Sequence, residues 1–246
     1  MEQRVQIQDE PLELAWPGED EPIRMLLGCA PIQDARGHLR GCLVTFSDVS
    51  ALHRINNQLL ETLRDLEASK EEIRRQNEDL HRLATRDPMT GCLNRRAFFD
   101  GADPLFEKIR DRQGELCCIM SDIDHFKSFN DRYGHTVGDM VIKSVAKCLA
   151  SELREVDLLC RYGGEEFAIL LIGSDIARAA EAAERIRARV ESSTVPGDGD
   201  ISVSFTVSIG VAQLQPADTT DLGFFDRADA ALYAAKGGGR NRVMRG

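Results

Sequence analysis

The chain has 246 residues, of which 42% are apolar and 29% are charged, a composition that is ordinary for a soluble globular protein. Its formal net charge of −10 excludes a surface that coats nucleic acid, because such a surface needs a basic stripe. A nucleotide substrate stays open, since an acidic protein can bind phosphate through a metal ion and a few local cations.

The seven cysteines form no CxxC pair and no Cys/His cluster with the spacing of a zinc site. Their odd number predicts reduced thiols in the core of a protein from a reducing compartment. Residues 1–5 lack the apolar stretch of a signal peptide, and the longest apolar runs are far shorter than the roughly 20 residues that span a bilayer. We therefore expect a cytoplasmic protein with no membrane segment in this chain.

The first 50 residues predict a small β segment. Residues 1–21 are acidic and contain two prolines, which indicates a loose lead-in. Two strand-like runs follow at 23–32 and 41–46, and the polar segment 33–38 between them predicts a turn. Either Asp48 or Ser50 could cap the helix that comes next.

The longest predicted helix covers residues 51–84, where neither glycine nor proline occurs. Five apolar residues recur there every seven positions, as expected for a coiled coil: Leu52, Leu59, Leu66, Ile73 and Leu80. The alternative is a single helix that packs on its own domain, but such a helix usually carries a wider apolar stripe. We therefore predict a coiled coil, roughly 50 Å long at 1.5 Å per residue, that joins two copies of the chain.

The remaining residues alternate between helical and strand-like patterns. Helices are predicted at 95–110, 140–153, 177–191 and 225–236, and strands at 116–121, 158–162, 167–172 and 201–214. Alternating strands and helices around one core indicate the α/β class. The predicted organisation is a sensor fragment at 1–50, a coiled-coil helix at 51–85 and a catalytic domain at 86–246.

A glycine pair and two acids form the first candidate site. Gly163 and Gly164 join two strand-like runs and predict a tight hairpin in which glycine accepts positive φ. Glu165 and Glu166 stand beside its tip, and strand alternation would send them to opposite faces. Taken alone, such a tip is more often simply solvated.

The second candidate site follows the buried strand at 116–121. Asp122 ends that strand, and acids at the carboxyl end of such a strand face the ligand crevice of open α/β sheets. Together with Glu165 it could hold Mg²⁺ through oxygen ligands. Asp124 could instead cap the following turn.

These segments together resemble the GGDEF family of diguanylate cyclases in its GGEEF variant. The resemblance covers about residues 86–246 and runs in order through 87–96, 122–127, 130–131, 134–135, 138–139, 161–167, 208–210 and 228–241. Met89 and Cys92 stand where the family usually has leucine. The resemblance implies the nucleotidyl cyclase/polymerase-palm fold, a central mixed sheet flanked by helices. It also implies a homodimer that condenses two GTP into cyclic di-GMP and two pyrophosphates.

The family's metal and catalytic roles transfer to matching positions. The resemblance implies that Asp122 and Glu165 bind Mg²⁺, or Mn²⁺ in its place, with help from the Ile123 carbonyl. Glu166 would lie at the metal site and help to activate the attacking 3′-hydroxyl. Arg161 would support the charge that develops during the reaction.

The resemblance also implies a GTP pocket. Asn130 and Asp139 would read the guanine edge, and a carboxylate accepts from guanine donors that adenine lacks, so GTP is favoured over ATP. Phe126 and Ile142 are candidate pocket walls, although an ordinary core role fits them equally well. Five further residues are implied to bind the substrate, the first three through its phosphates: Lys127, Lys236, Arg240, Gly163 and Gly164.

A third motif, Arg154 with Asp157, resembles the family's inhibitory site for the product cyclic di-GMP, and Arg185 stands where relatives carry a second arginine. Arginine can grip a phosphate or the guanine edge with two parallel hydrogen bonds. The alternative is a surface salt bridge between positions i and i+3, worth a few tenths of a kcal/mol.

Three functions remain in competition. The leading one is an active cyclase. The second is a cyclic di-GMP receptor with little catalysis, and the third is a signalling adaptor. Residues 23–50 resemble the end of a PAS sensor domain, and because only its final part is present we assign neither haem nor flavin. The sequence reveals no input signal, no physiological output, and no indication of whether the coiled coil holds an active or an inactive dimer.

Overall fold

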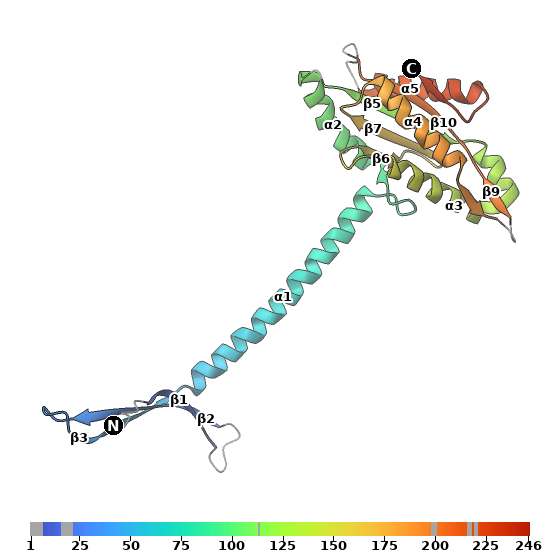
Figure 1. The fold of residues 1–246 in the computed structure, drawn as a ribbon. Coiled ribbons are helices and arrows are strands. Elements are labelled where there is room, and N and C mark those ends of the chain that lie inside the picture. The colour runs from blue at the N-terminus through green and yellow to red at the C-terminus, as the bar shows by residue number, and fades with distance from the viewer. Residues whose placement is uncertain (1–6, 16–21, 113, 198–200, 216–217, 219–220) are drawn as a thin grey trace. The chain divides into compact units, whose positions relative to one another are not determined.

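The computed structural model describes residues 7–15, 22–112, 114–197, 201–215, 218 and 221–246 (Figure 1). The chain folds into two compact units, Met1–Asn77 and Glu78–Gly246. Among the described residues, no helix combines the length and the apolar character that crossing a membrane requires.

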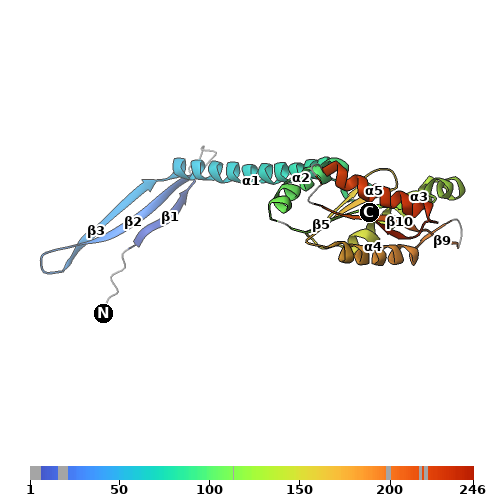
Figure 2. The ribbon, with the colours of Figure 1, turned by 90° about the horizontal axis from the view of Figure 1, so that it is seen from above.

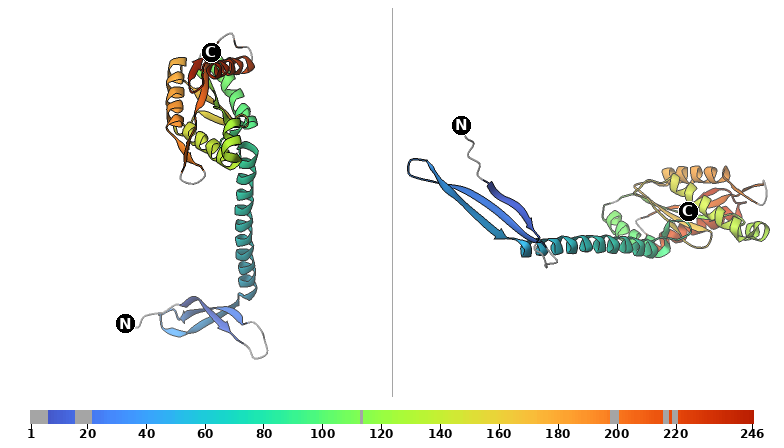
Figure 3. Two further views of the ribbon diagram at one scale, coloured as in Figure 1. Left: turned by 90° about the vertical axis from the view of Figure 1, so that its right-hand side faces the viewer. Right: turned by 90° about the horizontal axis from the view of Figure 1, so that it is seen from below.

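The N-terminal unit contains an antiparallel sheet in the order β1-β2-β3, with β1 at Ile7–Leu14, β2 at Ile23–Gln33 and β3 at Leu39–Asp48 (Figure 3). The strand β1 shows that the prediction of a loose lead-in is wrong for residues 7–14, while 1–6 and 16–21 lie outside the described residues. The proline Pro11 had indicated a loop. It is compatible with a strand here because β1 lies at the edge of the sheet, where a proline is tolerated.

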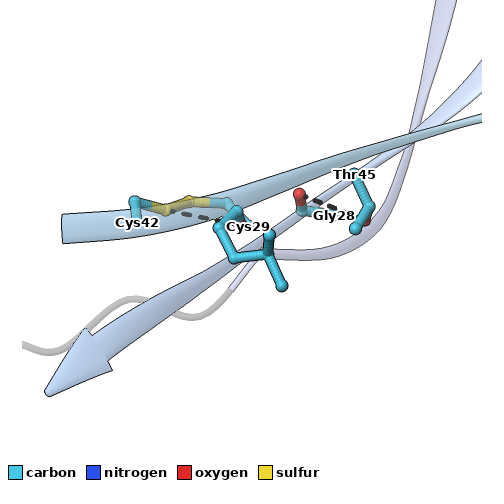
Figure 4. The surroundings of a disulfide bond; sticks show 5 residues. Gly28, Cys29, Cys42 and Thr45 are labelled. Carbon is cyan, nitrogen blue, oxygen red and sulfur yellow. Dashed lines mark hydrogen bonds between the residues drawn. A yellow bond between two sulfur atoms is a disulfide. The ribbon is translucent and has the colours of Figure 1, made fainter.

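A disulfide joins Cys29 on β2 to Cys42 on β3 (Figure 4). In the ladder Cys29 lies opposite Val44 and Cys42 opposite Pro31, so the two cysteines are diagonal neighbours with Cα atoms 6.4 Å apart. That distance is within the range that a disulfide spans. The prediction of seven reduced cysteines is therefore wrong for this pair, because strand register, and not sequence spacing, brought the two thiols together. The other five cysteines are free and buried.

The predicted long helix is confirmed as α1, Ser50–Thr85. It begins where the carboxylate of Asp48 accepts the backbone N–H of Ser50 at 2.9 Å. None of its residues is buried, and the five apolar residues of the seven-residue repeat are all more than half exposed. This apolar seam therefore lacks a partner within the described part of the chain, and the coiled-coil dimer stays a prediction.

The second unit is built on a six-stranded mixed sheet in the order β11-β10-β5-β7-β6-β4. Its strands are β4 (Leu93–Asn94), β5 (Leu116–Ile123), β6 (Leu158–Arg161), β7 (Glu166–Ile172), β10 (Val207–Gln213) and β11 (Val243–Arg245). The two edge strands run parallel to their neighbours and the central pairs are antiparallel. A separate pair, β8 (Thr194–Pro196) and β9 (Ser202–Ser204), completes the unit.

Helices cover both faces of this sheet (Figure 2). On one face α3 (Phe126–Ser151) and α4 (Ile176–Glu191) pack against side chains such as Ile119, Ile169 and Ile209. On the other, α2 (Arg95–Arg112) and α5 (Asp221–Gly237) pack against side chains such as Cys118 and Leu170. Every residue of β5 is buried. The predicted central mixed sheet flanked by helices is confirmed.

The helix α3 begins fourteen residues before the predicted start at 140. It is interrupted at Gly134, whose φ of 80° and ψ of 161° lie outside the helical range. Because only glycine adopts such a conformation at little cost, Gly134 divides α3 into two segments that meet at an angle. The first segment is confined to the few residues before Gly134, and so short a run does not reveal a helix by apolar periodicity.

Candidate functional site

The end of β5 and the start of β7 bring three acids together. Asp122 and Glu166 face each other directly across the β5–β7 ladder, and Glu165 immediately precedes the strand. Asp122 is buried, and its carboxylate Oδ2 lies 2.8 Å from the Nζ of Lys236 in the last turn of α5. The sequence prediction that the strand end and the hairpin tip meet thus agrees with the geometry.

Burial and neighbouring charges perturb two of these acids, Asp122 and Glu165. Burial raises the pKa of Asp122, although the hydrogen bond from Lys236 acts in the opposite direction. Burial also raises the pKa of Glu165, and the negative charges of Asp122 and Glu166 raise it further. Arg240 lies close enough to favour the charged form of Asp122. Such a concentration of negative charge in a partly dry site favours the approach of a cation.

The hairpin between β6 and β7 is braced by Arg161. Its guanidinium donates to the Gly164 carbonyl at 2.7 and 3.0 Å, and to the carboxylate of Asp87 at 3.2 Å. Arg161 therefore holds the shape of the hairpin in this structure, and it contacts the turn that follows α1. The sequence prediction placed it only near the developing charge of the reaction.

The two hairpin glycines do not have the backbone conformation that was predicted for them. Neither Gly163 nor Gly164 has a positive φ, so that prediction is wrong. A Cβ on Gly163 would lie 2.8 Å from the Oε2 of Glu166, whereas one on Gly164 would meet nothing within 4 Å. The Glu166 carboxylate therefore lies close against Gly163, where a larger residue would displace it.

The bent helix α3 carries the predicted base-reading residues. The Oδ1 atom of Asn130 is buried and lacks a hydrogen-bond partner in the described part of the chain. Asp139, on the second segment of α3, is half-buried. Phe126 and Ile142 both belong to the main core cluster, which supports the core role weighed for them. Lys127 is exposed in the first turn of α3.

Asp124 has a role that sequence reasoning missed. The expected cap of the following turn is wrong, since its carboxylate accepts the hydroxyls of Thr206 and Ser208 at 2.7 and 2.6 Å. It also accepts the backbone N–H of Asn241 at 3.0 Å. Asp124 therefore ties the end of β5 to β10 and to the segment that carries Arg240.

That segment is held in an unusual conformation. Arg240 and Asn241 have φ values of 60° and 46°, the left-handed region that residues other than glycine seldom occupy. The Asn241 side chain donates to Glu191 at 2.7 Å and accepts from Arg187 at 2.8 Å. Together with Asp124, these contacts fix the segment, which explains why two successive residues keep a strained backbone.

The predicted inhibitory residues gather at a second place. Arg154 pairs with Asp157 at 2.9 Å, and it also donates to the Ile172 carbonyl at 2.7 Å. Arg185 pairs with Glu152 at 3.2 Å. A cavity of about 260 Å³ is lined by these four charged side chains together with Ser174, Arg178 and Glu181. The salt bridge considered as the alternative is thus present, and it forms part of a cavity lined by three arginines and three acids.

Comparison with known proteins identifies the family. The family model described as "Diguanylate cyclase, GGDEF domain" matches residues 84–242, and the chain belongs to this family. It is 42% identical over 165 residues to the probable diguanylate cyclase DgcT of Escherichia coli K12, covering 66% of this chain and 36% of that relative. It is 40% identical over 192 residues to the diguanylate cyclase VdcA of Vibrio cholerae, covering 77% and 54%. The chain therefore spans between about a third and about half of these curated relatives.

Solved structures show the same fold. The coiled coil and GGDEF domain of DgcB from Caulobacter crescentus, in complex with c-di-GMP, has a TM-score of 0.71 and 36% identity, covering 76% of this chain and 99% of that one. The active GGEEF domain of a diguanylate cyclase from Vibrio cholerae has a TM-score of 0.57 and 35% identity, covering 63% and 96%.

Proposed function

We propose that the chain is an active diguanylate cyclase, which joins two GTP molecules into cyclic di-GMP with release of two pyrophosphates. The observation that carries this proposal is the meeting of three carboxylates and two cationic side chains where β5 ends and β7 begins: Asp122, Glu165, Glu166, Lys236 and Arg240. Such a set can hold a metal–nucleotide complex and balance its charge.

A magnesium ion fits the acids at the end of β5 and the start of β7. Asp122 and Glu165 offer hard oxygen ligands, and both carry pKa values raised by burial, so a divalent cation would relieve their repulsion. No group of three or more His, Cys, Asp or Glu residues in the described part of the chain could hold a metal ion by itself. Mg²⁺ is commonly bound by one or two carboxylates plus substrate phosphates, so GTP would complete the coordination, with help from the Ile123 carbonyl. Mn²⁺ suits the same oxygen ligands.

The reaction follows from the charges. The 3′-oxygen of one GTP attacks the α-phosphorus of the other, and the bond to pyrophosphate breaks; a second attack with the roles exchanged closes the ring. Glu166 assists removal of the hydroxyl proton, and Lys127, Lys236 and Arg240 neutralise phosphate oxygens. A bound metal ion supplies further charge neutralisation and lowers the cost of deprotonating the hydroxyl.

Asn130 and Asp139 would read the guanine. The unpartnered Oδ1 of Asn130 is a buried acceptor, and an acceptor without a partner costs free energy until a ligand donates to it. Guanine presents N1 and N2 donors where adenine does not. These two residues would therefore discriminate GTP from ATP.

The proposed enzyme works as a homodimer, because each domain holds one GTP and the two nucleotides must attack each other. The exposed apolar seam of α1 supports pairing through a coiled coil. Tethering two domains in this way raises their effective concentration toward the millimolar range.

Product feedback is part of the proposal. The cavity of Arg154, Asp157 and Arg185 contains three arginines, which are suited to a ligand that carries phosphates and guanine edges, as cyclic di-GMP does. The same cavity favours the second candidate function, a cyclic di-GMP receptor with little catalysis.

Incubation of the purified chain with GTP and Mg²⁺, followed by mass spectrometry of the products, separates the two functions. The cyclase predicts cyclic di-GMP and two pyrophosphates for each product molecule. A receptor would bind added cyclic di-GMP and leave GTP unchanged, and that result would refute the proposed activity.

A further inference from the structure

We infer that Gly138 determines nucleotide specificity. Because this position has no side chain, the Asn130 amide can occupy the space beside it, and there its free Oδ1 can accept a hydrogen bond from the base. The inference rests on the proposed function, in which Asn130 reads guanine. It assigns to Gly138 a positioning role, since Gly138 itself would not touch the substrate through a side chain.

The geometry starts from the bend in α3. Gly134 interrupts the helix, and across this bend the Asn130 side chain reaches Gly138. Eight residues separate Asn130 and Gly138 in sequence, more than two helical turns, and an unbroken helix would hold them about 12 Å apart. The bend therefore creates a contact that a straight helix would not allow.

A side chain at position 138 would occupy the place of the Asn130 amide. A Cβ built on Gly138 overlaps the Oδ1 of Asn130, lies 3.0 Å from its Cγ, and lies 3.3 Å from the Cζ of Phe126. Gly138 has no positive φ, so backbone conformation does not require glycine here. The requirement is space alone, and the atom that fills the space is the buried, unpartnered oxygen.

The overlap would have unequal effects on folding and on binding. The atom that must move is the far end of a short, flexible side chain, which a rotamer change can displace at modest cost. The displaced amide would carry its Oδ1 away from the buried position against residue 138. An alanine at 138 should therefore leave the domain folded and impair base recognition.

The test measures binding of 3′-deoxy-GTP and 3′-deoxy-ATP by calorimetry with Mg²⁺, because neither nucleotide has the attacking hydroxyl. We expect Gly138→Ala to weaken 3′-deoxy-GTP binding about tenfold to a hundredfold, the effect of leaving a buried polar group unpaired. Discrimination against 3′-deoxy-ATP should fall in the same proportion. The matched control is Gly101→Ala on α2, where a Cβ would meet only Leu158 at an ordinary 3.5 Å, and binding should be unchanged.

A double variant shows whether Gly138 acts through Asn130. Asn130→Ala removes the group that the new methyl would displace, so adding Gly138→Ala to it should change affinity by less than about twofold. An equal loss in both backgrounds, or wild-type binding by Gly138→Ala, would overturn the inference while the cyclase proposal stands. If Gly138→Ala fails to fold, the double variant should fold and bind like Asn130→Ala, and a double variant that also unfolds would overturn the inference. A wild-type chain that binds neither nucleotide would refute the proposed function and this inference together.

Discussion

The carboxylate of Asp124 offers the sharpest test of how the site is held in place. It accepts hydrogen bonds from Thr206, Ser208 and the backbone of Asn241, and it is 8% exposed. Asp124→Ala would leave three donors without an acceptor. The Thr206 hydroxyl is only part-buried and can turn toward water, whereas Ser208 is fully buried and the Asn241 N–H is fixed by the chain.

The Ser208 hydroxyl and the Asn241 N–H, left without an acceptor, determine the expected loss of stability. At about 1–3 kcal/mol for each, Asp124→Ala should lower the free energy of unfolding by roughly 2–6 kcal/mol. Asp124→Asn keeps the size and one acceptor oxygen but turns an amide N–H₂ toward another donor, so about 1–3 kcal/mol should be lost. Both variants should also raise the KM for GTP, because the segment that carries Arg240 loses its anchor.

Urea unfolding and steady-state turnover of GTP measure the two effects. Arg240→Ala should raise the KM without changing the unfolding midpoint, which separates the anchor from the group that it positions. Asp103→Asn is the matched control, an exposed aspartate on α2 whose substitution should change stability by no more than about 0.5 kcal/mol. If Asp124→Asn unfolds at the same urea concentration as this control, the reasoning about the anchor is refuted.

Three further predictions concern the rest of the chain. A protein that starts near Leu83 should be mostly monomeric, with a specific activity that climbs with concentration, and sedimentation that shows the same monomer fraction with residues 51–84 present would refute the coiled coil. Arg154→Ala should weaken cyclic di-GMP binding by roughly 1.5–3 kcal/mol in calorimetry and keep the initial GTP turnover; equal affinities would leave Arg154 with a structural role only. Thiol titration of the unfolded, unreduced chain should find five free thiols and one disulfide, and seven thiols would contradict the Cys29–Cys42 bond.

Sequence patterns identified the elements whose apolar residues form a continuous run or a regular repeat. The buried strand that carries Asp122 stood out as a continuous apolar run, and the helix α1 stood out through five apolar residues at seven-residue spacing. The strand β1 did not stand out, since an edge strand accepts Pro11 and charged residues. The first segment of α3 was also missed, because Gly134 ends the helical spacing of its apolar residues after about two turns.

The residues of the candidate site could be predicted where a short sequence motif indicates their chemical role. Asp122 was a candidate because it ends a buried strand, and Glu165 because it stands at a hairpin tip, and the resemblance to the family assigned both to a metal ion. The anchor of Asp124 was not, because its partners lie more than 80 positions away and only the register of β5 with β10 brings them together. The Cys29–Cys42 disulfide depends on register in the same way. Such contacts form only when the strands pair in the folded sheet, so the sequence around each residue does not indicate them.

The turnover of GTP by Asp122→Ala, compared with the wild type and with Asp103→Ala, tests the central claim most directly. If Asp122 holds the metal–nucleotide complex, its loss removes several kcal/mol of transition-state stabilisation, and cyclic di-GMP should form about a thousandfold more slowly or not at all. The variant should stay folded, because removing one of three clustered acids relieves repulsion. Asp103→Ala should retain wild-type turnover. Near-normal production of cyclic di-GMP by a folded Asp122→Ala protein would contradict the account.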